Sequence, residues 1–155
     1  MKQYIGTKII EAEPAYRCMD GQGRVTITDD PSEAFPNFPS VEDGYRVRYA
    51  DGYVSWSPKD TFEEAYRPTD AMNFGLAIEA AKRGAKIARR GWNGKGQYVE
   101  LASAISYVAP GGETVNAEHE AIGNRAFAFV GTSGVQMGWL ASQADMLADD
   151  WHIVK

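Results

Sequence analysis

Hydrophobic and polar positions alternate along several short stretches in the first part of the chain. This alternation predicts strands at residues 4–12 and 24–28. Residues 29–43 carry three prolines among acidic residues and are predicted to form a loop. Residues 44–50 and 53–57 alternate on either side of Asp51-Gly52, which predicts a hairpin closed by a type I′ turn.

A short helix is predicted directly after this hairpin. Ser57 is expected as its N-cap and Pro58 as its first helical residue. Phe62 and Tyr66 repeat at helical spacing and would dock the helix onto the hairpin. Because the residue before a proline avoids helical geometry, the chain is expected to divide at Arg67-Pro68.

The second part opens with the clearest helical pattern. Thr69 or Asp70 is expected to cap a helix that includes Phe74 and ends at Gly84. Ser142 and Asp145 have the spacing of a capping box, which predicts a short helix over 141–148. Residues 103–124 lack a pattern and are interpreted as an irregular excursion. Strands are predicted at residues 85–90, 97–102, 125–130, 135–139 and 151–154.

These elements predict an α+β fold of small antiparallel sheets with short helices. The fold is divided into two small modules, at residues 1–67 and 71–155. The single cysteine excludes an intramolecular disulfide, and one cysteine with two distant histidines makes a structural metal site unexpected. A net charge of −5 argues against nucleic-acid polymers as partners, and no apolar run is long enough to span a membrane.

Catalytic machinery is not recognisable in the sequence. His119, His152 and Cys18 lie outside any nucleophilic motif. Among the C-terminal aspartates, Asp145 is interpreted as a helix-cap partner, and Asp149 and Asp150 as solvated residues. We therefore expect no catalytic residue and no enzyme activity.

Residues 88–96, with the sequence ARRGWNGKG, form the most suggestive stretch for ligand binding. Three glycines surround an indole, an amide and several cations. Arg89 and Arg90 point to opposite sides of a strand, so one of them, with Lys95, is expected to contact phosphate while the other is structural. The alternative is a tight hairpin with an exposed basic rim, in which Trp92 is a core residue.

A second cluster at residues 138–143 adds to this picture. The start of a helix favours anions, and Gln143 in its first turn could contact a base or a ribose hydroxyl. Trp139 fits a ligand contact and a core position equally well. Together the two clusters provide the side chains of a nucleotide site.

Three motifs, at residues 72–80, 88–96 and 139–151, resemble the second Thoeris anti-defence family of phages and prophages. The resemblance covers about residues 72–155. It implies a nucleotide sponge that binds glycocyclic ADP-ribose, the signal made by bacterial TIR proteins, and withholds this signal without degrading it. It also implies homo-oligomers with pockets at subunit contacts. Some members sequester cyclic oligonucleotides of cGAS-like (CBASS) systems at a separate site.

The resemblance also implies ligand-binding positions. Trp92 and Asn93 match one motif, and Ser142, Gln143 and Asp145 match another. Neighbouring positions complete the expected ligand-binding set, namely Phe74 and Arg90. Residues 103–124 match no motif, and residues 4–14 and 52–58 are similar to a small phage module to which no function is attached.

The sequence-based hypothesis is thus a sponge for a cyclic nucleotide signal in the cytoplasm of an infected bacterial host. No cofactor and no metal is expected, and the partners are the nucleotide and other copies of the chain. Two alternatives remain: a hydrolase or lyase of the nucleotide signal, and a protein-binding phage adaptor that uses the aromatic hairpin at residues 45–56.

Overall fold

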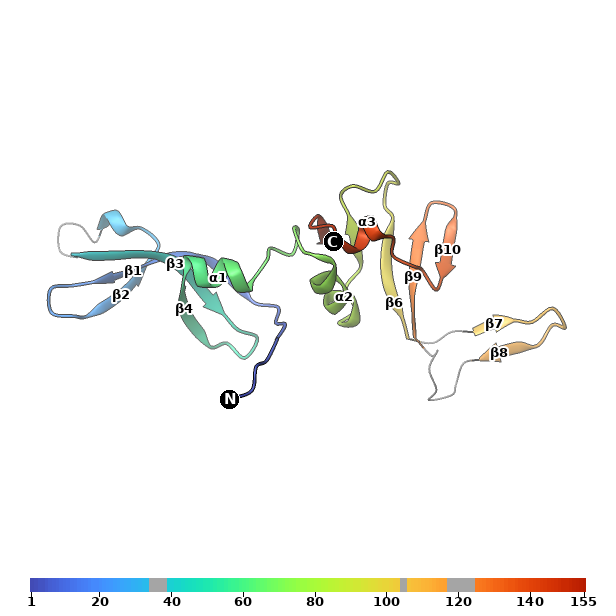
Figure 1. Ribbon diagram of the computed structural model, residues 1–155, viewed down its shortest axis with the longest axis horizontal. Helices are drawn as coiled ribbons and strands as arrows, with labels where there is room; N and C mark the ends of the chain where they lie inside the picture. Colours follow the sequence, from blue (N-terminus) through green and yellow to red (C-terminus); the bar gives the residue numbers. More distant parts are fainter. Residues whose placement is uncertain (34–38, 104–105, 117–124) are drawn as a thin grey trace. The chain divides into compact units, whose positions relative to one another are not determined.

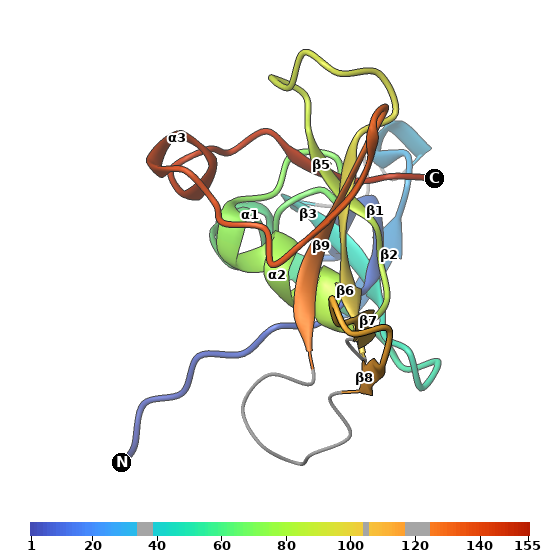
Figure 2. The same ribbon diagram turned by 90° about the vertical axis from the view of Figure 1, so that its right-hand side faces the viewer.

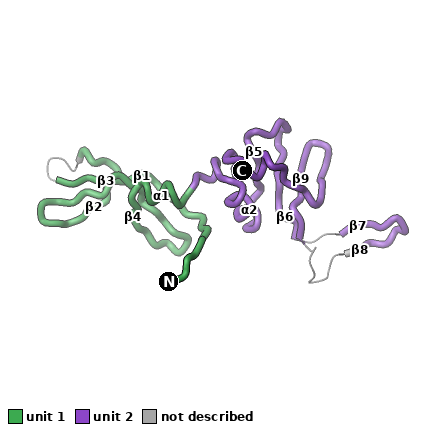
Figure 3. The backbone as a smooth tube through the Cα atoms, in the orientation of Figure 1, with its two compact units in different colours: residues 1–66 green, residues 67–155 purple. Residues whose placement is uncertain are grey.

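The computed structural model describes residues 1–33, 39–103, 106–116 and 125–155 of the chain. The chain forms two compact units, residues 1–66 and residues 67–155 (Figure 3). Both units combine antiparallel strands with short helices, so the predicted α+β class is confirmed. No helix in the described part of the chain is long and apolar enough to cross a membrane.

The first unit contains a four-stranded antiparallel sheet in the order β2-β1-β3-β4 (Figure 1). A short 3-10 turn, Pro31–Glu33, follows the second strand, and one helix, α1 (Lys59–Ala65), packs against β3 and β4. The strands are β1 (Glu11–Met19), β2 (Val25–Thr28), β3 (Ser40–Arg48) and β4 (Val54–Pro58).

Four local predictions for this unit are wrong. Residues 40–43, predicted as the end of a loop, form the start of β3. The first strand starts at Glu11, because β1 pairs with β3 from Glu11↔Arg48 onward and residues 4–10 lie outside the sheet. Ser57 lies within β4, and Pro58 occupies the N-cap position of α1. The hairpin is confirmed, but its turn is not type I′: only Gly52 has a positive φ, and the amide of Gly52 donates to the carbonyl of Tyr49.

The second unit contains a five-stranded antiparallel sheet in the order β10-β9-β6-β5-β11. Its strands are β5 (Ile87–Arg89), β6 (Tyr98–Ala102), β9 (Ala126–Gly131), β10 (Gly134–Met137) and β11 (Trp151–Ile153). The helix α2 (Phe74–Lys82) packs on β5, β6 and β11. It lies close to β6 in the views of Figures 1 and 2. Three buried alanines of α2 allow this close approach, and they share a core with Ile87, Val99 and Trp151.

Asn73, rather than Thr69 or Asp70, caps α2, since its Oδ1 accepts a hydrogen bond from the amide of Leu76 at 2.9 Å. Gly84 follows the helix with φ 93°, as the sequence predicts for its C-terminal end. Within the predicted irregular excursion at 103–124, the structure contains a small hairpin of β7 (Ser106–Val108) and β8 (Thr114–Asn116). Residues 104–105 and 117–124 of that excursion lie outside the described residues.

Candidate functional site

Asp145 lies in a single-turn helix, α3 (Gln143–Met146), that starts with the predicted capping box. The Ser142 Oγ accepts a hydrogen bond from the Asp145 amide at 3.1 Å, and Asp145 Oδ2 accepts one from the Ser142 amide at 3.0 Å. The Ser142 hydroxyl also donates to Asp145 Oδ2 at 2.7 Å. The box fixes the Asp145 carboxylate at the start of the helix.

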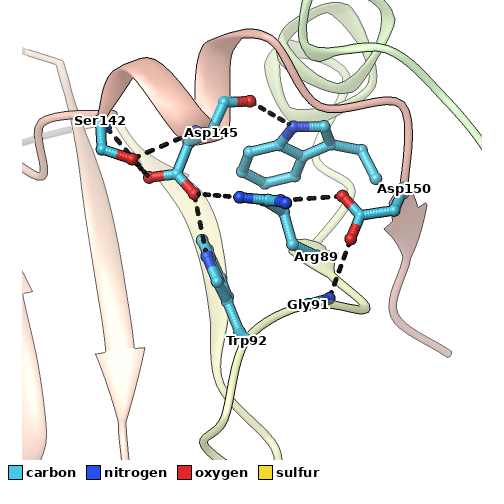
Figure 4. A network of polar contacts seen from close by, with 7 residues as sticks. Arg89, Gly91, Trp92, Ser142, Asp145 and Asp150 are labelled. Atoms are coloured by element: carbon cyan, nitrogen blue, oxygen red, sulfur yellow. Dashed lines mark hydrogen bonds and ion pairs between the residues drawn. The ribbon is translucent and has the colours of Figure 1, made fainter.

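The other carboxylate oxygen of Asp145 faces Arg89, the last residue of β5. The guanidinium of Arg89 reaches Asp145 Oδ1 at 2.9 Å and Asp150 Oδ1 at 2.8 Å (Figure 4). Asp150 also accepts a hydrogen bond from the Gly91 amide at 2.9 Å. The interpretation of Asp150 as a solvated residue is therefore wrong, because its carboxylate connects the start of β11 to the glycine loop.

This network shifts the acidity of its members. Burial raises the pKa of Asp145, but hydrogen bonds from Ser142, Arg89 and Trp92 outweigh it and lower the pKa to about 2. The hydrogen bond from Arg89 lowers the pKa of Asp150, and both aspartates in turn raise the pKa of Arg89. All three side chains are therefore charged at neutral pH, and the two carboxylates more than neutralise the single guanidinium.

Trp92 is half-buried in an aromatic cluster. Its ring meets Phe129 at 5.4 Å, Trp139 at 6.0 Å and Trp151 at 5.4 Å between centroids, each edge to face. Its Nε1 donates to Asp145 Oδ1 at 3.1 Å. These contacts agree with the alternative in which Trp92 and Trp139 pack in the core.

The glycine loop comes close to the Arg89 network at Gly91. A Cβ atom there would lie 3.1 Å from Asp150 Oδ2 and 3.3 Å from Arg89 Nη2, so a larger residue would push on both groups. Further along the loop, Gly96 has φ 69°, which other residues adopt only with strain. The side chains of Asn93 and Lys95 lie between these points and are exposed.

The remaining predicted site residues lie at the margin of this network. Arg90 is exposed, and its guanidinium pairs with Asp70 at 3.2 Å. Phe74 is the first residue of α2, and the centroid of its ring lies 5.4 Å from that of Trp151. Gln143 is exposed on α3. Within the described part of the chain, no three His, Cys, Asp or Glu side chains gather as metal ligands.

Comparison with known proteins places this second unit in a family. The profile described as a Thoeris anti-defense 2-like domain matches residues 72–154, which is more than half of the chain. The chain belongs to this family. It is also 36% identical over 87 residues to a protein of Bacillus phage SP01 named Thoeris anti-defense 2. That similarity covers 54% of this chain and 94% of the phage protein.

The Thoeris anti-defense 2-like domain thus includes every predicted site residue. Its structure joins Trp92, Ser142 and Asp145 directly through hydrogen bonds and brings Phe74 to the same cluster through Trp151. Arg90 instead faces Asp70. Whether these residues contact a ligand stays a prediction.

Sequence reasoning missed two of the residues that hold this domain together, Asp150 and Trp151. The Trp151 Nε1 donates to the backbone carbonyl of Asp145 at 2.9 Å, and Trp151 is fully buried. Arg89 and Trp151 are opposite each other in the β5–β11 pair. The pairing of β5 with β11 is what brings Asp150 and Trp151 to Arg89, and a single sequence does not reveal which strands pair.

Proposed function

We propose that this protein binds glycocyclic ADP-ribose made by bacterial TIR proteins and withholds it from its effector without cleaving it. The protein would act inside the infected host cell and would need no cofactor. Two findings support the proposal. The chain belongs to the Thoeris anti-defense 2-like family, and the matched residues include both clusters predicted to bind the ligand, at residues 88–96 and 138–143.

The observation that carries the proposal is the contact between Trp92 and Asp145. This hydrogen bond, at 3.1 Å, holds the glycine loop against the segment that starts α3. The exposed amides of Asn93 and Gln143 extend from these two joined segments. Amide side chains suit a ligand with an adenine ring and ribose hydroxyls, because they both donate and accept hydrogen bonds.

The phosphates of the ligand need cations, and Arg89 is already neutralised by Asp145 and Asp150. We assign the phosphate contacts to Lys95, which is exposed, and to Arg90, whose ion pair with Asp70 is exposed to water and can open to receive a phosphate. The start of α3 is a poor anion site, contrary to the sequence-based expectation, because the carboxylate of Asp145 already occupies its cap. The negative charge of the ligand is then balanced by exposed cationic side chains of the glycine loop.

Isothermal titration calorimetry with glycocyclic ADP-ribose tests this site. We expect Asn93→Ala and Gln143→Ala each to weaken binding by about tenfold, since each removes hydrogen bonds to the ligand. The matched control is Gln22→Ala, an exposed glutamine of the first unit that should leave the affinity unchanged. Wild-type affinity in both site variants would overturn the assignment.

A further inference from the structure

The first unit carries a row of aromatic side chains that the proposed function does not use. The Tyr45 ring stacks on Phe62 at 4.1 Å, and Phe62 stacks on Tyr66 at 4.9 Å. Tyr49 stacks on Tyr53 at 5.8 Å. Burial and a side-chain hydrogen bond with Tyr49 raise the pKa of Tyr66, and this hydrogen bond joins the group of three rings to the pair. We call these five residues the tyrosine face.

This face is open to solvent and has a carboxylate at each end. Tyr53 is 64% exposed, whereas the other four rings are half-buried. At one end the Tyr45 hydroxyl donates to Glu63 Oε1 at 2.8 Å. At the other end Asp51 Oδ1 accepts a hydrogen bond from the Tyr53 amide at 3.0 Å. Aromatic faces and carboxylates both attract cations.

A cation already sits on the tyrosine face. The Lys8 Nζ lies 5.1 Å from the centroid of the Tyr49 ring. Lys8 belongs to the segment of residues 1–10, which lies outside the strands and exposes Tyr4 and Ile5 almost completely. None of residues 1–10 belongs to a strand, although their alternating sequence is typical of one.

The surroundings of the face suit an extended chain. β4 is an edge strand of the first sheet and begins directly after Tyr53. An edge strand can pair with an added peptide through main-chain hydrogen bonds. The whole chain has a net charge of −5, which favours a basic partner.

We propose that the tyrosine face is a docking site for an extended segment of a partner protein that carries a lysine or arginine. Residues 1–10 occupy part of this site within the chain itself, with Lys8 in the place of the partner's cation. The partner's side chain displaces Lys8 from Tyr49 and reaches the carboxylates at the ends of the face.

A synthetic peptide with the sequence of residues 3–12 is the probe, because it carries a cation already seen on Tyr49. Its dissociation constant is measured by nuclear magnetic resonance titration of the ¹⁵N-labelled full-length chain. We expect the peptide to bind the Lys8→Ala variant two- to fivefold more tightly than it binds the wild type. The reason is that the variant lacks the exposed cation–π contact of Lys8 that competes with the peptide. The control Lys2→Ala, with the same change of charge, should match the wild type.

Two further variants separate docking from damage to the fold. Adding Tyr49→Ala to Lys8→Ala should abolish the gain, and adding Tyr49→Phe should keep most of it, because phenylalanine retains the ring. A peptide with glutamine in place of its lysine should bind more weakly to every variant. The proposal is wrong if Lys8→Ala and Lys2→Ala bind the peptide equally, if the glutamine peptide binds as well, or if the peptide does not bind.

Discussion

The Asp145 carboxylate accepts hydrogen bonds from three side chains and one amide that come from different parts of the second unit. Arg89 and Trp92 reach it from β5 and the loop that follows, and Ser142 reaches it from the cap of α3. Its side chain is 13% exposed and that of Arg89 is 17% exposed, so water screens this pair weakly. One residue thus positions both segments of the candidate site.

Asp145→Asn tests this positioning role. The amide keeps the size of the side chain but removes the charge that faces Arg89, and we expect the free energy of unfolding to fall by about 2 kcal/mol. Urea unfolding followed by tryptophan fluorescence measures it, since three tryptophans surround the site. The control is Asp149→Asn, an exposed neighbour. An equal loss of stability in both variants would contradict the role of Asp145.

The pKa of Asp145 also predicts a dependence on pH. Its folded value is near 2 and its ordinary value is 3.8, so the charged form stabilises the fold above about pH 4. This stabilisation, roughly 2 kcal/mol, is lost as the pH falls from about 4 to 2. Unfolding experiments across this range should show a smaller pH dependence in Asp145→Asn than in the wild type. Identical pH profiles would exclude the shift.

At the scale of elements, the pairing of β3 with β4 depends on a glycine. A Cβ atom at Gly44 would collide with the indole of Trp56 and with the backbone of Ser57. The Trp56 Nε1 donates to the Ala15 carbonyl at 3.1 Å, which ties β4 across β3 to β1. β4 and the Trp56 indole can approach β3 this closely because position 44 has no side chain.

Gly44→Ala is therefore expected to destabilise the first unit by about 2 to 3 kcal/mol, as overpacking against a backbone atom does. Gly21→Ala is the control, because a Cβ atom at Gly21 has no atom within 4 Å. Thermal unfolding followed by circular dichroism compares the two variants. Equal melting temperatures would show that Trp56 can move away at little cost.

The sequence predicted those elements whose signals are local. The capping box of Ser142 and Asp145 and the hairpin around Gly52 are both confirmed, because each depends on residues within a few positions. The predicted start of the first strand and the interpretation of Asp150 as a solvated residue were wrong. Both depend on partners far along the chain, since β1 pairs with β3 and Asp150 lies 61 positions from Arg89. Local patterns do not contain that information.

At the scale of the whole molecule, the family match lies inside the second unit. We propose that this unit also mediates self-association. Leu140 precedes α3 and Leu147 follows it, and these two large apolar side chains are 88% and 79% exposed, which is typical of a surface that a partner covers. A second copy that covers them would lie next to the candidate site.

Sedimentation velocity tests this assembly. We expect the wild type to sediment as a homo-oligomer and the double variant Leu140→Lys with Leu147→Lys to sediment as a smaller species. Val25→Lys, on an exposed strand position of the first unit, is the control and should keep the wild-type mass. A monomeric wild type, or an unchanged oligomer in the leucine variant, would contradict the proposal.

We propose that the protein withholds a nucleotide signal and leaves it intact. The most direct measurement is mass spectrometry of the nucleotide after three steps: incubation of glycocyclic ADP-ribose with excess protein, removal of the unbound fraction, and heat denaturation of the protein. We expect the free nucleotide to disappear on incubation and the intact nucleotide to be recovered, in stoichiometric amount, after heating. Fragments of the nucleotide in the heated sample, or free nucleotide that remains undiminished before heating, would contradict it.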